Sequence, residues 1–156
     1  MDLEKQKTLR PTPISLRLPL LAQGMSKHAL CSGDNSTMRV HCYSTGMGET
    51  HGLHAHPEEE HVFLVLHGRV QFSDLDGKLP TLSVHQGLWI PKGCFYEFYN
   101  PGPEPLVILR FGAMQKGADE SMRLDPEGHF IPGRSSQNPE LARPVVMEGV
   151  YFGATA

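Results

Sequence analysis

The chain has 156 residues, of which 39% are hydrophobic and 20% are charged, a balance that suits one globular domain. The net charge of −3 provides no basic field for a phosphate backbone, so no nucleic-acid partner is expected. No apolar run approaches the roughly 20 residues that a membrane span needs, and the charged first residues differ from a secretion signal. The 3 cysteines, an odd count without CxxC spacing, predict reduced thiols and a cytoplasmic protein.

Short strands separated by turn residues account for most of the predicted structure. Several early prolines argue against a helix in residues 1–25, and the alternating Ile14, Leu16, Leu18 and Leu20 predict a short edge strand. Further strands are predicted at 38–44, 62–66, 69–73, 81–84, 88–90, 96–99 and 106–111. Many short strands at this spacing, with glycine and proline turns between them, predict an all-β sandwich or barrel.

The tail after the last predicted strand has weak periodicity and several turn formers. A long structureless tail would be unusual in a compact domain, so we expect it to wrap the barrel or a neighbouring subunit. Its candidate contacts are hydrophobic: Val145, Val146, Val150 and Phe152. The prediction is one domain in three parts: an N-terminal arm with an edge strand (1–37), a barrel (38–112) and a C-terminal extension (113–156).

Histidines at alternate positions form the most informative local feature. His54 and His56 are separated by one residue, and residues two apart on an extended strand point to the same face. They could therefore chelate one ion, and a bend after the following proline could bring His61 to the same centre. Three neutral imidazoles match zinc, iron, nickel or copper sites. The alternative is a solvated loop beside the three glutamates at 58–60.

Two longer stretches resemble the motifs of the cupin family. Residues 54–68, His-Ala-His-Pro-Glu-Glu-Glu-His-Val-Phe-Leu-Val-Leu-His-Gly, resemble the first motif, in which two histidines precede a glutamate and then a glycine. Residues 91–100, Pro-Lys-Gly-Cys-Phe-Tyr-Glu-Phe-Tyr-Asn, are similar to the second, with proline, glycine and asparagine at the family spacing. The resemblance implies an all-β jelly-roll barrel (a double-stranded β-helix) whose interior holds a small ligand or metal.

Two departures from the family pattern concern the metal site, and a third places His85 where the family has a glycine. Counting back from Gly68 places His61, not Glu60, at the glutamate position, and strand neighbours face opposite ways, so only one of them points inward. Tyr96 stands where the family has a fourth metal-binding histidine. The resemblance thus implies one divalent ion, such as Fe(II), zinc, nickel or manganese, held by three histidines: His54, His56 and His61.

Two roles are open for Tyr96. A nearby dication would lower its pKa, and a bound phenolate would restore the neutralisation that the glutamate normally gives. A neutral phenol would instead donate a hydrogen bond to a substrate oxygen. We favour the neutral role, because catalytic sites keep an open coordination position, and Tyr96 is then the predicted catalytic residue.

Other polar residues have simpler interpretations. The histidines in predicted loops are expected to be solvated: His28, His51, His85 and His129. His41 shares a strand face with Arg39 and Tyr43, and that face could line the barrel or look at solvent. Exposure is expected for Arg39, because charged residues are rarely buried unless paired, and Arg110 has the same ambiguity.

The leading functional hypothesis is a metal-dependent enzyme of dioxygenase type, because histidine-only ligation in cupins resembles that of thiol and diketone dioxygenases. The resemblance also allows an isomerase, a lyase or a cyclase. A non-catalytic cupin that binds a small ligand or a metal is the alternative from a different class. The expected partners are a small molecule and a second copy of the chain, since an apolar edge left open by residues 14–20 invites pairing into a homodimer.

Overall fold

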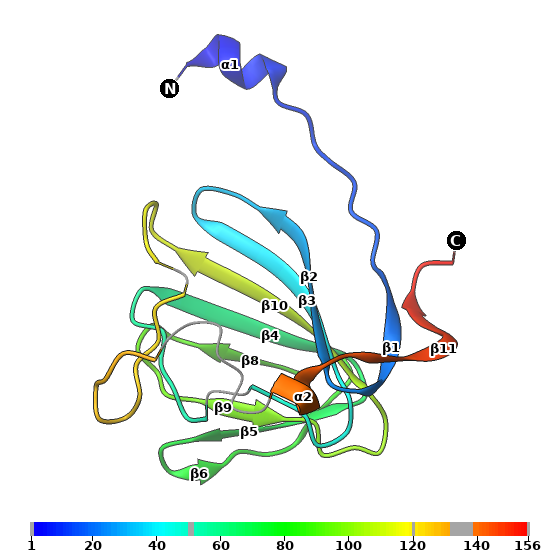
Figure 1. Cartoon of the computed structure of the whole chain (residues 1–156). Helices are drawn as coiled ribbons and strands as arrows, with labels where there is room; N and C mark the ends of the chain where they lie inside the picture. Colours follow the sequence, from blue (N-terminus) through cyan, green and yellow to red (C-terminus); the bar gives the residue numbers. More distant parts are fainter. Residues whose placement is uncertain (1, 50–51, 120, 132–138, 156) are drawn as a thin grey trace.

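The computed structural model describes residues 2–49, 52–119, 121–131 and 139–155. The elements in chain order are α1 (Leu3–Thr8), β1 (Arg17–Gln23), β2 (Met25–Ser32), β3 (Ser36–Tyr43), β4 (Glu59–His67), β5 (Arg69–Asp74), β6 (Gly77–Lys78), β7 (Leu82–Ser83), β8 (Gly87–Ile90), β9 (Glu97–Tyr99), β10 (Leu106–Met114), α2 (Pro139–Ala142) and β11 (Val145–Gly153). The predicted all-β barrel architecture is confirmed, and the two helices are short (Figure 1).

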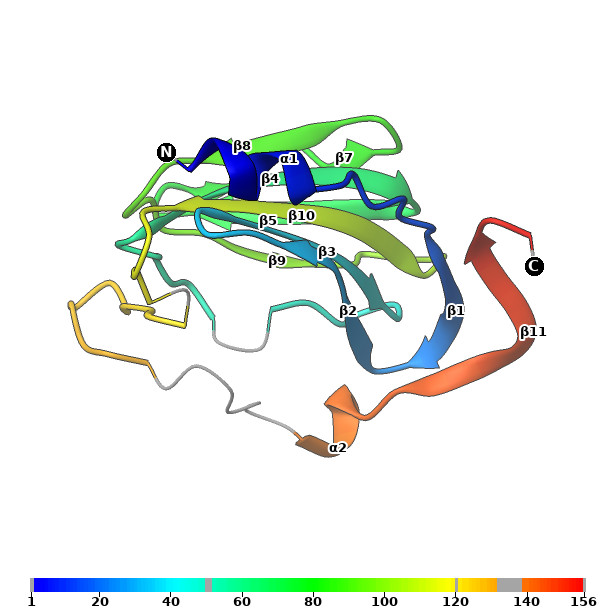
Figure 2. The same ribbon diagram turned by 90° about the horizontal axis from the view of Figure 1, so that it is seen from above.

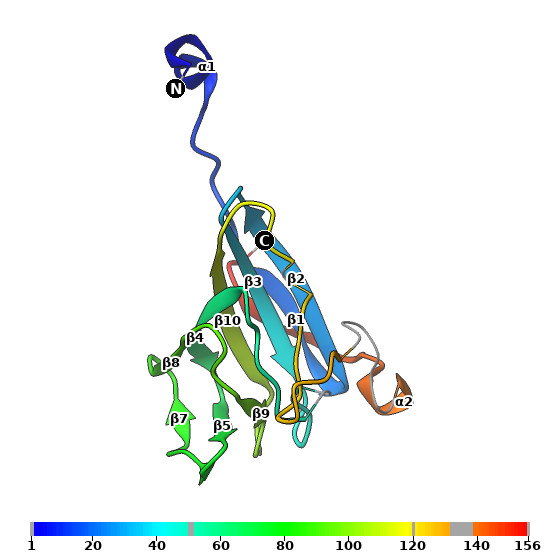
Figure 3. The ribbon, with the colours of Figure 1, turned by 90° about the vertical axis from the view of Figure 1, so that its left-hand side faces the viewer.

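Two facing sheets form the barrel (Figure 3). The larger sheet has the order β2-β3-β10-β4-β8, and the smaller one has β5 at its centre, paired with β6, β7 and β9. Strand β10 pairs antiparallel with β3 on one side and with β4 on the other. These three neighbouring strands carry several of the polar side chains of the site described below, among them His41, Glu59, His61 and Arg110.

Hydrophobic side chains that alternate along the strands fill the space between the two sheets. This cluster joins residues of both sheets, among them Tyr43, Phe63, Phe72, Phe98 and Ile108. Because strand residues point alternately to the two faces, the same strands also present apolar residues outward. The space between the two sheets is therefore filled largely by apolar side chains.

A separate two-stranded sheet of β1 and β11 packs against the larger sheet near one end of its strands (Figure 2). Leu18, Leu20 and Leu21 of β1 are buried against Val40 and Cys42 of β3. Strand β1 pairs antiparallel with β11 of the same chain. The strand predicted at residues 14–20 thus exists as β1 at Arg17–Gln23, and it pairs with β11 of the C-terminal extension.

One expectation for the N-terminal arm is wrong. Residues Leu3–Thr8 form α1, which ends before the first proline at Pro11. The Asp2 side chain caps it by accepting hydrogen bonds from the backbone N–H groups of Glu4 and Lys5. No residue of α1 is buried, and Figure 1 shows it standing away from the barrel. No helix in the described part of the chain is long and apolar enough to cross a membrane.

Candidate functional site

The histidine pair His54 and His56 lies in the segment before β4, which backbone hydrogen bonds hold against the rest of the barrel. The amide of His54 donates to the carbonyl of Tyr96 over 3.1 Å, and the amide of Tyr96 donates back over 2.9 Å. The amide of Gly93 donates to the carbonyl of His56 over 2.9 Å. The two imidazoles lie side by side, with ring centroids 5.2 Å apart.

Strand β4 supplies the next polar groups from alternate positions. Glu59, His61 and Phe63 are buried in the barrel interior, whereas Glu60 between them is only partly buried. The inward orientation expected for His61 is therefore the one found. Glu59 was grouped with a possible solvated loop, yet it is one of the most buried side chains of the protein. Its inward orientation could have been predicted from its position two residues before His61, because residues two apart on a strand face the same way.

Three side chains form a group able to hold a metal ion. The ligand atoms of His56, Glu59 and His61 all lie within 4.8 Å of one another, and all three residues are buried. His54 lies beside this group without belonging to it. The structure therefore brings together two of the three predicted ligands and adds a carboxylate.

Arg110 on β10 contacts two members of this group. Its Nη2 atom lies 2.7 Å from Oε2 of Glu59 and 2.8 Å from Nε2 of His61. The same Glu59 oxygen lies 3.0 Å from Nε2 of His61. Arg110 thus faces the barrel interior, whereas the sequence leaves open whether it faces the interior or solvent. Its positive charge compensates the buried carboxylate of Glu59.

Tyr96 is buried next to the histidines. Its hydroxyl lies 3.0 Å from Nδ1 of His61, and its ring centroid lies 4.7 Å from that of His54. Burial raises the pKa of Tyr96, and the carboxylate of Glu49 raises it further. In this environment the side chain is a neutral phenol.

Burial also sets the charge of the imidazoles. It lowers the pKa of His54 and His56, and it lowers that of His61 to about 2, where Arg110 adds to the effect. All three are therefore neutral near pH 7, which is the form that binds metals.

A small cavity of about 30 Å³ opens beside the group. Its lining residues come from distant parts of the sequence: Lys27, Arg39, His41, Glu49, His56, Phe63, Tyr96, Arg110 and Arg123. The exposure expected for Arg39 is wrong, because it is partly buried and lines this cavity, and His41 is buried beside it. Arg123 was not foreseen, since it lies in the C-terminal extension, where Leu124 bridges to Ala55.

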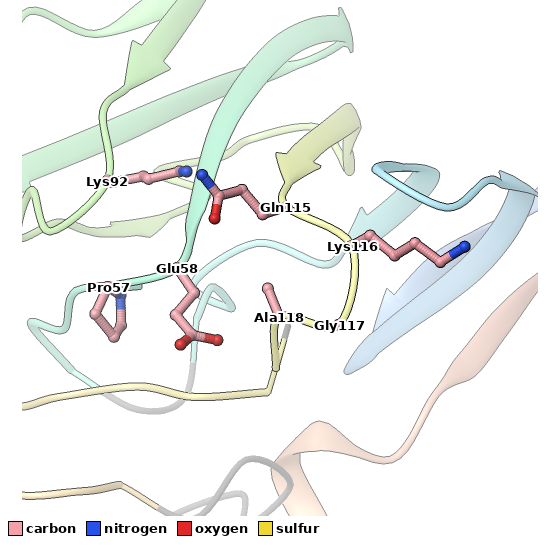
Figure 4. A pocket seen from close by; sticks show the side chains of 7 residues that line it. All are labelled: Pro57, Glu58, Lys92, Gln115, Lys116, Gly117 and Ala118. Atoms are coloured by element: carbon pink, nitrogen blue, oxygen red, sulfur yellow. The ribbon is translucent and has the colours of Figure 1, made fainter.

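Three of the histidines expected to be solvated, His28, His85 and His129, are exposed, but His28 lies on strand β2 and not in a loop. His51 lies outside the described residues. A larger hollow of about 340 Å³ is lined by Pro57, Glu58, Lys92 and residues 115–118 (Figure 4). It contains none of the histidines and mostly exposed side chains, so we do not assign the chemistry to it.

Comparison with known proteins agrees with this architecture. Residues 44–111 match the model of the cupin domain family. No curated protein matches the sequence significantly.

Three solved structures illustrate the likeness. An uncharacterised conserved protein with a double-stranded β-helix domain from Klebsiella pneumoniae has a TM-score of 0.55 at 18% identity, over 73% of this chain and 84% of its own. A cupin superfamily protein from Desulfitobacterium hafniense has a TM-score of 0.51 at 14% identity, over 58% and 78%. A recombinant oxalate oxidase in complex with glycolate has a TM-score of 0.50 at 16% identity, over 62% and 54%. At such identities the likeness concerns the fold alone.

Proposed function

We propose that this protein is a metal-dependent enzyme of dioxygenase type that acts on a small molecule in the small cavity beside His56 and Tyr96. The observation that carries the proposal is the buried group of His56, Glu59 and His61. Two imidazoles and one carboxylate are the donor set typical of non-haem Fe(II) oxygenases. The three-histidine set with His54 in place of Glu59 is the alternative first coordination sphere.

The chemistry of the buried donors supports a metal. Among the described residues, Nδ1 of His56 and Oε1 of Glu59 are buried polar atoms without a hydrogen-bond partner. Leaving such atoms unsatisfied is costly, by about 1–3 kcal/mol each, and ligation would satisfy them. One feature opposes it: an ion on His61 Nε2 and Glu59 Oε2 would have to displace the contacts of Arg110.

Hydrogen bonds fix the tautomers of two imidazoles. Nδ1 of His54 lies 2.8 Å from the carbonyl of Gly52, which can only accept, so Nδ1 carries the proton and Nε2 the lone pair. Arg110 can only donate to Nε2 of His61, so the Nδ1 proton of His61 points to the Tyr96 hydroxyl. Partners of this kind orient metal-binding imidazoles.

Tyr96 remains the proposed catalytic residue. Because its oxygen accepts the proton of His61 Nδ1, its own hydroxyl proton is available to a substrate oxygen in the cavity that it lines. The metal ion would supply redox or Lewis-acid chemistry. Phe63, which belongs to the buried aromatic cluster, gives the same cavity an apolar wall.

Elemental analysis of the purified full-length chain tests the metal, and oxygen uptake with candidate substrates tests the chemistry. We expect near-stoichiometric metal in the native protein and its loss in Glu59→Gln. The matched control Glu60→Gln changes the neighbouring carboxylate, which is not part of the group, and should retain the metal. A native protein that neither contains nor takes up metal would contradict the proposal.

A non-catalytic ligand-binding module is the second candidate. The contacts of Arg110 favour it, because they already compensate Glu59 and His61 without an ion. Two results together would support this candidate. The metal-free protein would bind a ligand, and no metal-loaded form would take up oxygen.

A further inference from the structure

His41 is a buried histidine that has no part in the candidate metal group or in the role proposed for Tyr96. It lies on β3, is 3% exposed, and lines the small cavity beside His56 and Tyr96. Its Nε2 is a buried polar atom without a hydrogen-bond partner among the described residues. Leaving such a nitrogen unsatisfied is costly, so its position points to a bound molecule as the partner.

The other ring nitrogen of His41 contacts a tyrosine. Nδ1 lies 3.0 Å from the hydroxyl of Tyr43, which is fully buried in the apolar cluster between the sheets. Tyr43 is not one of the described residues that line the cavity. Because the two ring nitrogens point in different directions, the edge that carries Nε2 is turned away from Tyr43. It is therefore the edge that His41 presents to the cavity.

Glu49 determines where the proton of the Tyr43 hydroxyl points. Burial raises the pKa of Tyr43, and Glu49 raises it further through its charge and a hydrogen bond with the phenol. Although burial opposes it, the ammonium of Lys27, 3.2 Å away, lowers the pKa of the Glu49 carboxylate. An ionised carboxylate only accepts, so the neutral phenol donates its one proton to Glu49.

The tautomer of His41 follows from this hydrogen bond. Burial lowers the pKa of His41, and the charge of Lys27 adds to the effect, so the imidazole is neutral and carries a single N–H. The oxygen of Tyr43, whose proton is directed to Glu49, can only accept, so this N–H is on Nδ1. Nε2 is left with a lone pair, which can accept a hydrogen bond but cannot donate one.

A molecule in the cavity has to satisfy two protein groups of opposite kind. Nε2 of His41 needs a donor, whereas the hydroxyl of Tyr96, which also lines the cavity, offers its proton to an acceptor. A hydroxyl oxygen donates and accepts at once, whereas a carbonyl or ether oxygen only accepts and an ammonium group only donates. The volume of about 30 Å³ has room for roughly two water-sized groups, such as a hydroxyl and the carbon that carries it.

We propose that the substrate class of this site is a small alcohol, whose O–H group donates a hydrogen bond to Nε2 of His41. His41 is then a residue that determines specificity, and Tyr43 together with Glu49 positions it by holding one tautomer. The word substrate rests on the proposed function, whereas the binding of the hydroxyl by His41 needs no metal.

The test compares 2-propanol with acetone, which has the same carbon skeleton but an oxygen that can only accept. Amide chemical-shift titration of the full-length protein, as purified and after metal removal, measures both affinities. We expect 2-propanol to bind at least about tenfold more tightly than acetone in both forms, because acetone leaves Nε2 of His41 unpaired. His41→Leu should remove this preference by weakening 2-propanol, whereas His28→Leu, at an exposed position of β2, should preserve it.

Nitrogen NMR spectra of the imidazole rings give a second measurement, which does not depend on the folding of a variant. In the unaltered metal-free protein, the hydrogen of His41 should be on Nδ1, and the Nε2 signal should move with 2-propanol and not with acetone. A hydrogen found on Nε2 would overturn the inference, because that nitrogen could then not accept. Equal affinity for the two compounds, or binding of neither, would refute the hydroxyl. A preference that survives His41→Leu would assign the hydroxyl to another group.

Metal content, measured on the same samples, separates this inference from the proposed function. Metal-loaded protein without preference for 2-propanol would refute the alcohol site and leave the metalloenzyme. Protein that takes up no metal but prefers 2-propanol through His41 would refute the metalloenzyme and leave the alcohol site. A preference that disappears with the metal would assign the hydroxyl to the ion and refute the role of His41.

Discussion

The Nη2 atom of Arg110 lies 2.8 Å from Nε2 of His61, the atom that this imidazole would offer to a metal ion. The same nitrogen lies 2.7 Å from Oε2 of Glu59. In the structure, the Arg110 guanidinium therefore occupies the position next to two candidate ligand atoms that a metal ion would take. A dication and the guanidinium compete for these atoms, and they also repel each other.

Arg110→Met is expected to raise the affinity for a divalent ion by about tenfold, since it removes the competitor and the repulsion. It should also lower the free energy of unfolding of the metal-free protein by about 3 kcal/mol, since Glu59 is left buried without its cation. Metal titration against a competing chelator measures the first effect, and denaturation in EDTA measures the second. Reduced metal affinity would instead mean that Arg110 positions the ligands.

Gly112 provides the space in which the Glu59 carboxylate lies. It pairs with His61 across β10 and β4, and a Cβ built on it would overlap Oε1 of Glu59. We expect Gly112→Ala to displace this carboxylate, to weaken metal binding and to destabilise the fold by about 1–3 kcal/mol.

The control for this variant is Gly33→Ala, whose Cβ would meet ordinary van der Waals contacts. A second comparison places Gly112→Ala in a Glu59→Ala background, where the overlap is gone and most of the destabilisation should disappear. Denaturation curves of the four variants measure both effects. A penalty of the same size in both backgrounds would show that the carboxylate is not the cause.

Strand alternation explains which site residues could be predicted. His61 and not Glu60 faces the interior, because residues two apart on β4 share a face down to Val65. The predicted strand began at residue 62, whereas β4 begins at Glu59, so the inward position of Glu59 was not foreseen. Arg123 could not be predicted, because no local pattern links it to residues more than sixty positions earlier.

The missed strands have a related cause. Strand β2 has no buried residue and no apolar alternation, so its sequence lacks the period of a half-buried strand. Strand β11 is exposed at nearly every position and is held by its pairing with β1. Such strands depend on a partner distant in sequence, which a local pattern does not reveal.

Single-ligand variants distinguish the two donor sets. His56→Ala and His61→Ala should each reduce metal affinity by at least about tenfold, because both belong to the compact group. His54→Ala should reduce it less, since His54 lies outside that group. His28→Ala, at an exposed position, is the control. Elemental analysis after dialysis measures the outcome, and a loss for His54→Ala as large as for His56→Ala would favour the three-histidine set.

Stability of the metal-free protein should fall with pH below the ordinary histidine pKa. Burial holds the pKa of His41, His56 and His61 low in the folded protein, whereas in the unfolded chain they titrate near about 6.5. Below that pH the unfolded state binds more protons, so each histidine removes about 1.4 kcal/mol of unfolding free energy per pH unit.

Urea denaturation in EDTA between about pH 7 and pH 5 measures this slope. His41→Gln should make the slope of unfolding free energy against pH shallower, by the contribution of one buried histidine. His28→Gln, at an exposed position, should leave the slope unchanged. Constant stability over this range would mean that the buried histidines bind protons without unfolding.

The homodimer remains a prediction, and the structure changes where its interface is expected. The apolar residues Leu18, Leu20 and Leu21 of β1 are buried within the chain, so they are not available to a second copy. Strand β11 instead exposes Val146 by 54% and Tyr151 by 52%. A strand with apolar side chains in solvent invites pairing with another chain, and twofold dimers are the commonest closed assembly.

Light scattering at micromolar concentration should therefore give twice the chain mass of 17.3 kDa. Val146→Lys combined with Val150→Lys should produce a monomer, because both side chains are exposed on β11 and charge would oppose their burial. Leu75→Lys, at an exposed position in the turn after β5, is the control and should leave the dimer intact. A chain lacking residues 1–16 keeps β1 and should also remain dimeric. A monomeric full-length protein would refute the dimer, and a dimer that survives both lysines would exclude β11 as its interface.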